Sequence, residues 1–210
     1  MQSAIKLFLA SSNPGKLAEF RVLTESADVI AGWDASAVFP EIALLPGFDS
    51  LPAFEEDAPT FGENAAGKAL HYSQLRDGLV FADDSGLVVP ALGGAPGVHS
   101  ARYAGPTATN ADRIAKLLGE LRGKRDAERA AYFVCAIALA QQGRAVAIVT
   151  ARVDGEILES PRGSGGFGYD PVFYFPALKK TFAELLPQEK NQISHRGNAF
   201  RKMLRSLITP

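Results

Sequence analysis

Hydrophobic and polar residues change their spacing several times along the chain, and each change marks the boundary of a predicted element. Residues 5–10, IKLFLA, form a short apolar run that predicts a strand. The polar stretch SSNPGK follows, and Leu17, Phe20 and Leu23 then recur at helical spacing behind Pro14. This spacing predicts a helix that begins near the proline.

The next part of the chain mixes irregular and periodic stretches. Residues 31–60 are rich in proline and glycine, which predicts irregular structure. Residues 60–77 have helical periodicity, with Thr60 and Glu63 placed as the two members of a capping box. Residues 78–92, GLVFADDSGLVVPAL, are apolar on both sides of two acids. We expect a strand there that is interrupted by an acidic turn.

The second half of the chain predicts a hairpin between helical segments. Residues 110–124 predict an amphipathic helix that is capped by Thr109 or Asn110 and ends at Gly123. Residues 129–160 hold two long β-prone runs around QQGR, which predicts a hairpin, and a DG pair in the second run predicts another tight turn. Residues 163–176 are a glycine-rich loop before a short aromatic strand, and residues 181–208 predict one short and one longer helix. Antiparallel strands in an α/β pattern predict a mixed sheet.

Length and composition place the chain among ordinary globular proteins. Its 210 residues, 47% of them apolar, suffice for one core, so we expect a single domain over residues 1–210. The net charge of −1 predicts no general attraction to nucleic acid or to anionic membranes. The single cysteine, Cys135, excludes an internal disulfide, and its apolar run is too short to span a membrane. Without a signal-like leader, the chain is expected to be cytoplasmic.

Two matches to nucleotide-binding patterns are rejected on their context. GENAAGK, residues 62–68, resembles part of a Walker A loop, but Ala69 stands where a magnesium-binding hydroxyl is required and the stretch is helical in pattern. GSGGFG, residues 163–168, matches G-x-G-x-x-G, but a strand-like VFYF follows where a helix is required.

Three constellations carry candidate chemistry. In SSNPGK, residues 11–16, side-chain and backbone donors and a lysine suit a phosphate, although ordinary helix capping explains them equally well. The acid pairs 55–56 and 83–84 suit Mg²⁺ and a bound water, the alternative being solvated acidic turns. Lys190, His195 and Arg196 offer donors near predicted helix starts, and could equally be surface residues.

An aromatic residue on a glycine frame, in FGYD at 167–170, adds a platform on which a base could stack. Phosphate donors, an acid pair, an aromatic platform and carbonyl-reading donors together indicate a nucleoside triphosphate site. The pattern leaves open which phosphate bond breaks and which base is preferred.

Over nearly its whole length the sequence resembles the inosine/xanthosine triphosphate pyrophosphatases, the RdgB-like enzymes also called ITPases. The motifs that carry the resemblance occur in order: SSNPGK, TFGENAAGKA, ADDSGL, LGGAPGVHSARYAG, GSGGFGYDPVF and EKNQISHRGNAF. The resemblance implies Mg²⁺-dependent hydrolysis of ITP, dITP and XTP to the monophosphate and pyrophosphate. It also implies an elongated α/β fold with a long mixed sheet, two lobes with the active-site cleft between them, and a homodimer.

The resemblance also implies roles for residues at the phosphate end. The triphosphate would be held by Ser11, Ser12, Asn13, Pro14, Gly15 and Lys16. Asp84 would be the catalytic acid that binds Mg²⁺ and activates water, with Asp83 supporting it. Glu55 would be the second metal-binding acid, although Glu56 could take that role. Lys68 would face the phosphates.

At the base end, the resemblance implies a second set of contacts. Ser85 would contact the substrate, and Phe167, Gly168, Tyr169 and Asp170 would cradle the base, with Phe167 stacking on it. Lys190, His195 and Arg196 would read the ring, the last two through its 6-oxo group.

Hydrogen-bond sense then predicts the base preference. Adenine presents a donor at C6 and would be rejected by donors at His195 and Arg196. Guanine shares the C6 oxygen, so its rejection must come from the 2-amino group, by residues that the sequence does not identify. Two alternatives stay open: a Maf-type pyrophosphatase for pyrimidine or modified nucleotides, which SHRGNAF disfavours, and a sensor that binds nucleotide without turnover. Lys16, Asp83, Asp84 and Lys190 disfavour the sensor.

Overall fold

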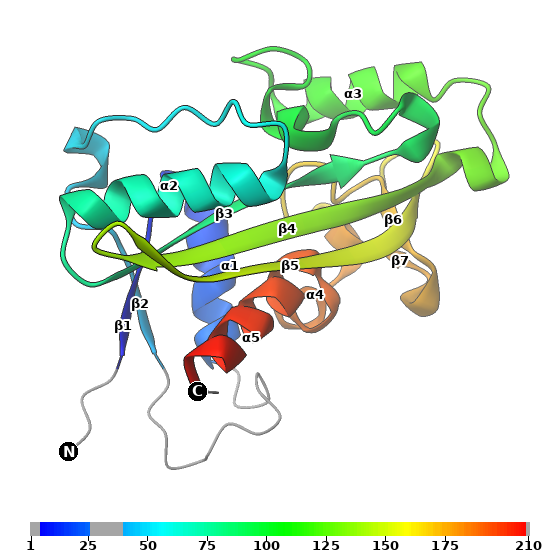
Figure 1. Ribbon diagram of the computed structural model, residues 1–210. Coiled ribbons are helices and arrows are strands. Elements are labelled where there is room, and N and C mark those ends of the chain that lie inside the picture. Colours follow the sequence, from blue (N-terminus) through cyan, green and yellow to red (C-terminus); the bar gives the residue numbers. More distant parts are fainter. Residues whose placement is uncertain (1–4, 26–39, 209–210) are drawn as a thin grey trace.

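A computed structural model describes residues 5–25 and 40–208 of the chain. Its centre is a seven-stranded sheet in the order β2-β1-β3-β4-β5-β6-β7 (Figure 1). The strands are β1 Lys6–Leu9, β2 Glu41–Leu44, β3 Leu79–Val88, β4 Ala130–Gln141, β5 Arg144–Ile157, β6 Phe173–Phe175 and β7 Lys180–Thr181. The pairs of β1 with β2 and β3 are parallel, and every later pair is antiparallel. The expected mixed sheet is confirmed.

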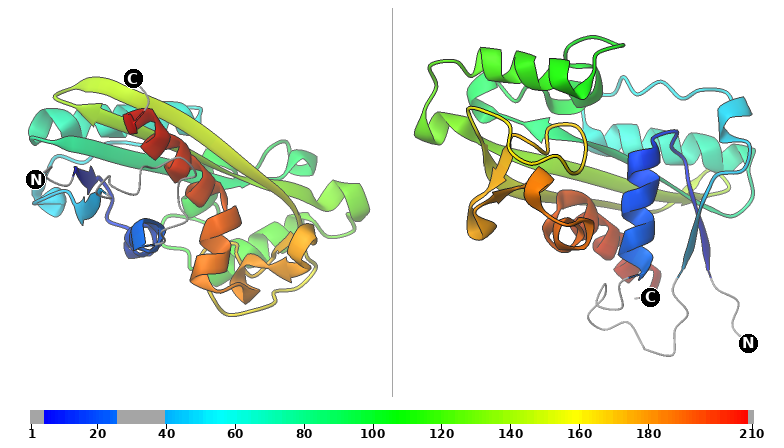
Figure 2. Two further views of the ribbon diagram at one scale, coloured as in Figure 1. Left: turned by 90° about the horizontal axis from the view of Figure 1, so that it is seen from below. Right: turned by 180° about the vertical axis from the view of Figure 1, so that it is seen from behind.

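Five α-helices flank this sheet within the described residues. They are α1 Pro14–Glu25, α2 Phe61–Leu75, α3 Asn110–Glu120, α4 Pro187–Ile193 and α5 His195–Ile208. Figures 1 and 2 show α2 on one face of the long strands and α1, α4 and α5 on the other. None of the helices in the described part of the chain is long and apolar enough to cross a membrane.

The core is divided into three clusters of buried side chains. On the face of α1 and α5, Phe20, Phe81 and Phe200 pack ring against ring. On the face of α2, alanines of the helix, among them Ala65, meet alanines of β4, so that the helix lies close to the sheet. A third cluster, around Phe133, joins β3–β6 to α3. The long strands β4 and β5 therefore connect the two ends of the sheet, whose side chains pack in separate clusters. The expectation of one domain with two lobes stays a prediction.

Several predicted elements are confirmed with their end signals. The Thr60 hydroxyl accepts a hydrogen bond from the Glu63 N–H at 3.2 Å and so caps α2, which runs through the rejected GENAAGK motif. Thr109 forms a complete capping box with Asp112 before α3, which ends at Glu120, before the predicted Gly123. The β4–β5 hairpin, the strand after GSGGFG and the two C-terminal helices also occur as expected, and Cys135 is buried and unpaired.

The predicted turn at Asp83-Asp84 is wrong. β3 pairs with β4 without a break from Val80 opposite Ala140 to Val88 opposite Tyr132. The Asp-Asp-Ser-Gly sequence favours a turn locally, but a long antiparallel partner supplies hydrogen bonds that hold it extended.

The predicted turn at Asp154-Gly155 is also wrong, because β5 stays paired with β4 through both residues. A Cβ on Gly155 would lie 2.5 Å from the carbonyl oxygen of Tyr174 in β6. The glycine therefore permits the close approach of a neighbouring strand and does not form a turn.

The stretch predicted as irregular contains a strand. β2, Glu41–Leu44, pairs in parallel with β1 and lies between Pro40 and Pro46, a spacing too short for periodicity to show. Residues 31–39 of the same stretch lie outside the described residues.

Candidate active site

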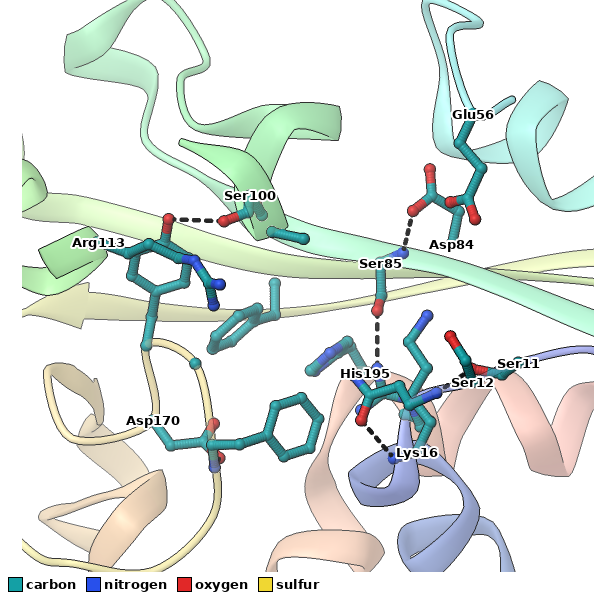
Figure 3. A pocket seen from close by; sticks show the side chains of 18 of the residues that line it. Ser11, Ser12, Lys16, Glu56, Asp84, Ser85, Ser100, Arg113, Asp170 and His195 are labelled. Carbon is teal, nitrogen blue, oxygen red and sulfur yellow. Dashed lines mark hydrogen bonds between the residues drawn. The ribbon is translucent and has the colours of Figure 1, made fainter. Parts of the chain in front are cut away.

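A cavity of about 330 Å³ lies at the edge of β3, beyond the point where β1 ends (Figure 3). Residues from both faces of the sheet line it: Ser11, Ser12, Asn13, Lys16, Glu56, Lys68, Asp84, Ser85, Gly86, Ser100, Ala101, Arg113, Phe133, Phe167, Gly168, Tyr169, Asp170, Lys190, His195 and Arg196. Most of the sequence-predicted site residues therefore meet in one place.

The short length of β1 explains the position of the cavity. β1 has four residues and pairs with β3 only as far as Phe81, where Ala10 N–H donates to the Phe81 carbonyl at 2.9 Å. From Asp83 to Leu87, β3 has β4 on one side and, among the described residues, no strand partner on the other. Because successive residues of a strand point to opposite faces, side chains above and below the sheet can both reach this open edge.

The two adjacent acids of β3 occupy different environments for the same reason. Asp83 is buried on the α1 and α5 face, where its carboxylate lies 3.0 Å from Lys16 Nζ and 3.3 Å from an Arg196 nitrogen. Burial alone would raise the pKa of Asp83, but Lys16 and Arg196 outweigh it and hold that pKa below its ordinary value. Asp83 is not part of the cavity wall and acts as a fixed countercharge behind it.

Asp84 points to the opposite face, toward α2, and lines the cavity. Its oxygens accept hydrogen bonds from Asn64 Nδ2 and from the Ser85 N–H, both at 2.9 Å. Burial, with a contribution from Glu56, raises the pKa of Asp84 to about 6, despite the Asn64 hydrogen bond that opposes the rise. Asp84 is thus a carboxylate held in place but short of positive charge.

The two adjacent glutamates lie in different surroundings. Glu56 lines the cavity, whereas Glu55 is exposed and lies outside it. Lys68, on α2, lies 2.5 Å from a Glu56 oxygen and faces the cavity beside it. Figure 3 shows the Glu56 and Asp84 carboxylates close together on one wall.

These two carboxylates fit a magnesium ion that takes some of its ligands from the protein and the others from a nucleotide. Within the described residues no group of three or more histidine, cysteine, aspartate or glutamate side chains is placed to hold a metal. Mg²⁺ commonly uses one or two carboxylates and completes its shell with phosphate oxygens and water. A cation between Glu56 and Asp84 would also offset the burial and the nearby Glu56 charge that together raise the Asp84 pKa.

The SSNPGK loop places donors at the start of α1. Asn13 Oδ1 accepts hydrogen bonds from the N–H groups of Gly15 and Lys16, so this side chain caps the helix as the simpler reading expected. Ser11, Ser12 and Lys16 line the cavity beside it, and Pro14 and Gly15 form the first turn of the helix. The positive end of α1 therefore faces the cavity.

The end of the cavity that the sequence predicts to bind the base is held together by buried ion pairs. Lys190 Nζ lies 2.6 Å from both a Glu19 oxygen and an Asp170 oxygen, and Glu19 also pairs with Arg196. Burial opposes the charge on Lys190, but Asp170 and Glu19 outweigh it and raise its pKa. Glu19 was not predicted, because an acid within an ordinary helical pattern carries no signal of its long-range partners.

Phe167 lies under two of these cations. Its ring centroid is 5.1 Å from Lys190 Nζ and 5.6 Å from the Arg196 guanidinium carbon. The Phe167 N–H donates to Asp170 Oδ2 at 2.8 Å, and the buried Tyr169 hydroxyl donates to the Ser100 carbonyl at 3.0 Å. The FGYD segment is therefore anchored at both ends of its turn and presents the aromatic ring to the cavity.

His195 is a neutral imidazole stacked on Phe133. The ring centroids are 4.6 Å apart and the planes differ by 10°. Burial, helped by Arg196, Lys190 and Lys16, lowers the pKa of His195 well below its ordinary value. Its Nδ1 is buried without a hydrogen-bond partner among the described residues, as expected of a group that meets a ligand.

Other lining residues were missed because their signals are not local. Gly86 admits Ser100, whose hydroxyl would lie 2.4 Å from an added Cβ. Phe133 and Arg113 reach the cavity from β4 and α3, and Asn64 supports Asp84 from α2. Each of these contacts depends on tertiary packing between distant segments.

Comparison with known proteins identifies the family that this fold and site define. The model of the Ham1 family matches residues 7–206, and the chain belongs to that family. It is 50% identical to a dITP/XTP pyrophosphatase of Geobacillus kaustophilus, over 94% of this chain and 92% of the relative. A dITP/XTP pyrophosphatase of Gloeobacter violaceus is 48% identical over the same shares.

Solved structures agree with the fold. The structure of a Ham1 protein from Coxiella burnetii superposes with a TM-score of 0.80 at 42% identity, covering 97% of this chain and 98% of that one. The Staphylococcus aureus Ham1 protein gives a TM-score of 0.79 at 36% identity, with 97% of each chain covered. The expected α/β architecture with a long mixed sheet is confirmed.

Proposed function

We propose that this protein hydrolyses deaminated purine nucleoside triphosphates, namely ITP, dITP and XTP, to the monophosphate and pyrophosphate, and so removes them from the nucleotide pool. The observation that carries the proposal is one cavity that joins two chemically different ends. Lys16, Lys68, Asp84 and Glu56 lie at one end, and the Phe167 platform with its buried cations lies at the other. The dITP/XTP pyrophosphatases among the relatives support the same substrate class.

Asp84 is suited to orient and deprotonate the attacking water. Its two hydrogen bonds fix the carboxylate, and without metal a pKa of about 6 leaves it mostly ionised at pH 7.5, the form that can accept a proton. The water oxygen bonds to the α-phosphorus as the bond to the bridging oxygen breaks, and pyrophosphate departs with that electron pair. Lys16 and Lys68 supply positive charge beside the phosphates.

Magnesium is the proposed cofactor, with Asp84 and Glu56 as its protein ligands. When bound, it would neutralise negative charge on the triphosphate and on the departing pyrophosphate. Glu56 replaces Glu55 in this role because only Glu56 lines the cavity.

The base is selected through hydrogen-bond donors. Arg196 is a permanent donor, and the neutral His195 carries a single ring N–H. With the histidine proton facing the ligand, both side chains donate, and the 6-oxo oxygen of the purine accepts from them. Adenine places its own amino donor there, which leaves buried donors unsatisfied and disfavours ATP.

The test is a product assay on purified protein with Mg²⁺ and ITP, XTP, dTTP, ATP and GTP. We expect pyrophosphate with IMP or XMP, and little turnover of ATP and GTP. Turnover confined to dTTP would replace the proposal with the Maf-type activity. Binding of ITP with no release of pyrophosphate would replace it with the nucleotide sensor.

We also propose a homodimer. β6 pairs with β5 only at Glu156 and Ile157, so most of β5 is an open edge among the described strands. Val146 and Ile148 on β5 are 48% and 53% exposed. An open edge with exposed apolar side chains favours association with a second copy. Sedimentation equilibrium would give the mass, and a monomer at micromolar concentration would overturn this part; the cytoplasmic location stays a prediction.

A further inference from the structure

One cation of the cavity wall has no part in the reaction described above. Among the described residues that line the cavity, Arg113 is the only lysine or arginine without an ion pair. Lys16, Lys68, Lys190 and Arg196 each face a carboxylate, whereas Arg113 does not. Its positive charge is therefore available to a ligand.

Arg113 is held in place by neutral acceptors only. Its two terminal nitrogens donate to Asn110 Oδ1 and to the Ala108 carbonyl, both at 2.7 Å. Its Nε is buried and has no hydrogen-bond partner among the described residues. A guanidinium has five N–H donors and no acceptor, so most of its donors remain unused. The side chain also lies near the positive end of α3, where a cation is unfavourable unless an acceptor compensates it.

The position of Arg113 matches one edge of a purine. Figure 3 shows its guanidinium beside Ser100, on the opposite side of the cavity from Ser11, Ser12 and Lys16, with His195 between the two ends. A nucleotide whose phosphates lie near Lys16 directs the ring edge farthest from its ribose toward the Arg113 end. That edge carries the C6 and C2 substituents.

We infer that Arg113 reads the C2 substituent of the purine and so sets the order XTP, ITP, GTP. The inference rests on the proposed function and extends it, because His195 and Arg196 account only for C6. Xanthine has an acceptor oxygen at C2, which matches a donor-only guanidinium. Hypoxanthine has only hydrogen there, and guanine has an amino donor that would face donors with no acceptor between them. Arg113 therefore supplies the discrimination against GTP that C6 contacts cannot provide.

The test compares kcat/KM for XTP, ITP, GTP and ATP in the wild type and in Arg113→Met. We expect the XTP-to-ITP ratio to fall about tenfold and the GTP-to-ITP ratio to rise about tenfold, the size of one hydrogen bond to a charged group. The ATP-to-ITP ratio should stay unchanged, because adenine and hypoxanthine both carry hydrogen at C2. Arg113→Lys, which keeps a donor, should retain part of the preference.

Arg122→Met is the matched control, because Arg122 is exposed and lies outside the cavity wall. It should leave all four substrates unchanged. An equal loss for every substrate in Arg113→Met would show a merely structural role and overturn the inference, as would unchanged ratios. If Arg113→Met does not fold, binding of XMP, IMP and GMP to the wild type and to Arg113→Lys decides the same question. A wild type that releases no pyrophosphate from ITP or XTP would instead overturn the proposed function.

Discussion

The two ends of the cavity differ in how completely their charges are matched. At the base end, Glu19 and Asp170 neutralise Lys190 within 2.6 Å, and Arg196 is paired with Glu19 and Asp83. At the phosphate end, Asp84 and Glu56 face each other with Lys68 as the nearest cation partner of Glu56. Apart from Arg113, the charges of the base end are thus matched within the protein, whereas under the proposed function the phosphate end would gain its missing positive charge from a bound magnesium ion.

The largest effect is expected from substitution of Asp84, the acid that has no ion pair among the described residues. Asp84→Asn removes the group that takes the proton from water, so kcat should fall by about 10²–10⁴-fold. The variant should remain folded, because the amide can still accept one of the two hydrogen bonds. Stopped-time pyrophosphate assays with circular dichroism would check both points, with the exposed Asp57→Asn as control. A rate near that of wild type would remove Asp84 from the mechanism.

Substitution of the neighbouring acid, Asp83, should affect the stability of the fold more strongly than substitution of Asp84 does. Asp83→Asn leaves Lys16 without its buried countercharge and Arg196 with Glu19 alone, which should destabilise the fold by about 3–5 kcal/mol. Denaturant titration of Asp83→Asn and Asp84→Asn side by side would measure the contrast. Similar stabilities for the two variants would mean that the faces of β3 are not as different as the ion pairs indicate.

Glu55 and Glu56 together allow a sharper test of the phosphate end of the cavity. Glu56→Gln should weaken activation by Mg²⁺ about 10–100-fold, the usual loss when a metal site is perturbed. Glu55→Gln should leave the Mg²⁺ dependence unchanged, because its side chain is exposed outside the cavity. Activity measured across a Mg²⁺ titration distinguishes them. A larger effect at Glu55 would restore the assignment made from sequence.

The smallest expected effect is a pH dependence of stability without metal. The folded-state pKa of Asp84, about 6, lies above its ordinary value of 3.8, so folding favours the protonated form. This stability is fully present below about pH 4 and is lost as the pH rises through 6. Asp84→Asn lacks the titration and should gain about 1–3 kcal/mol over wild type at pH 7.5 but not at pH 4. Thermal melts at both pH values would check this, and a constant difference would contradict the raised pKa.

The comparison also shows what sequence could and could not predict. SSNPGK, FGYD and the His195-Arg196 pair were each located from local chemistry, and the structure brings them to one cavity. The sequence did not predict that Asp83 and Asp84 lie on opposite faces of β3, because their local sequence favours a turn and only pairing with β4 keeps it extended. Glu19 and Arg113 were missed because a charged residue on a helix is ordinary, and only long-range packing makes it unusual.

The short β1 strand has a consequence for solubility as well as for binding. An open strand edge normally invites another strand to pair with it. Here the Asp84 carboxylate accepts from the exposed-edge Ser85 N–H at 2.9 Å, and Lys16 Nζ donates to the Asp83 carbonyl at 3.2 Å. Two side chains assigned to catalysis therefore also occupy the backbone groups through which β3 could join a foreign sheet. The side chains of the candidate site therefore also protect the unpaired edge of β3 against aggregation through strand pairing.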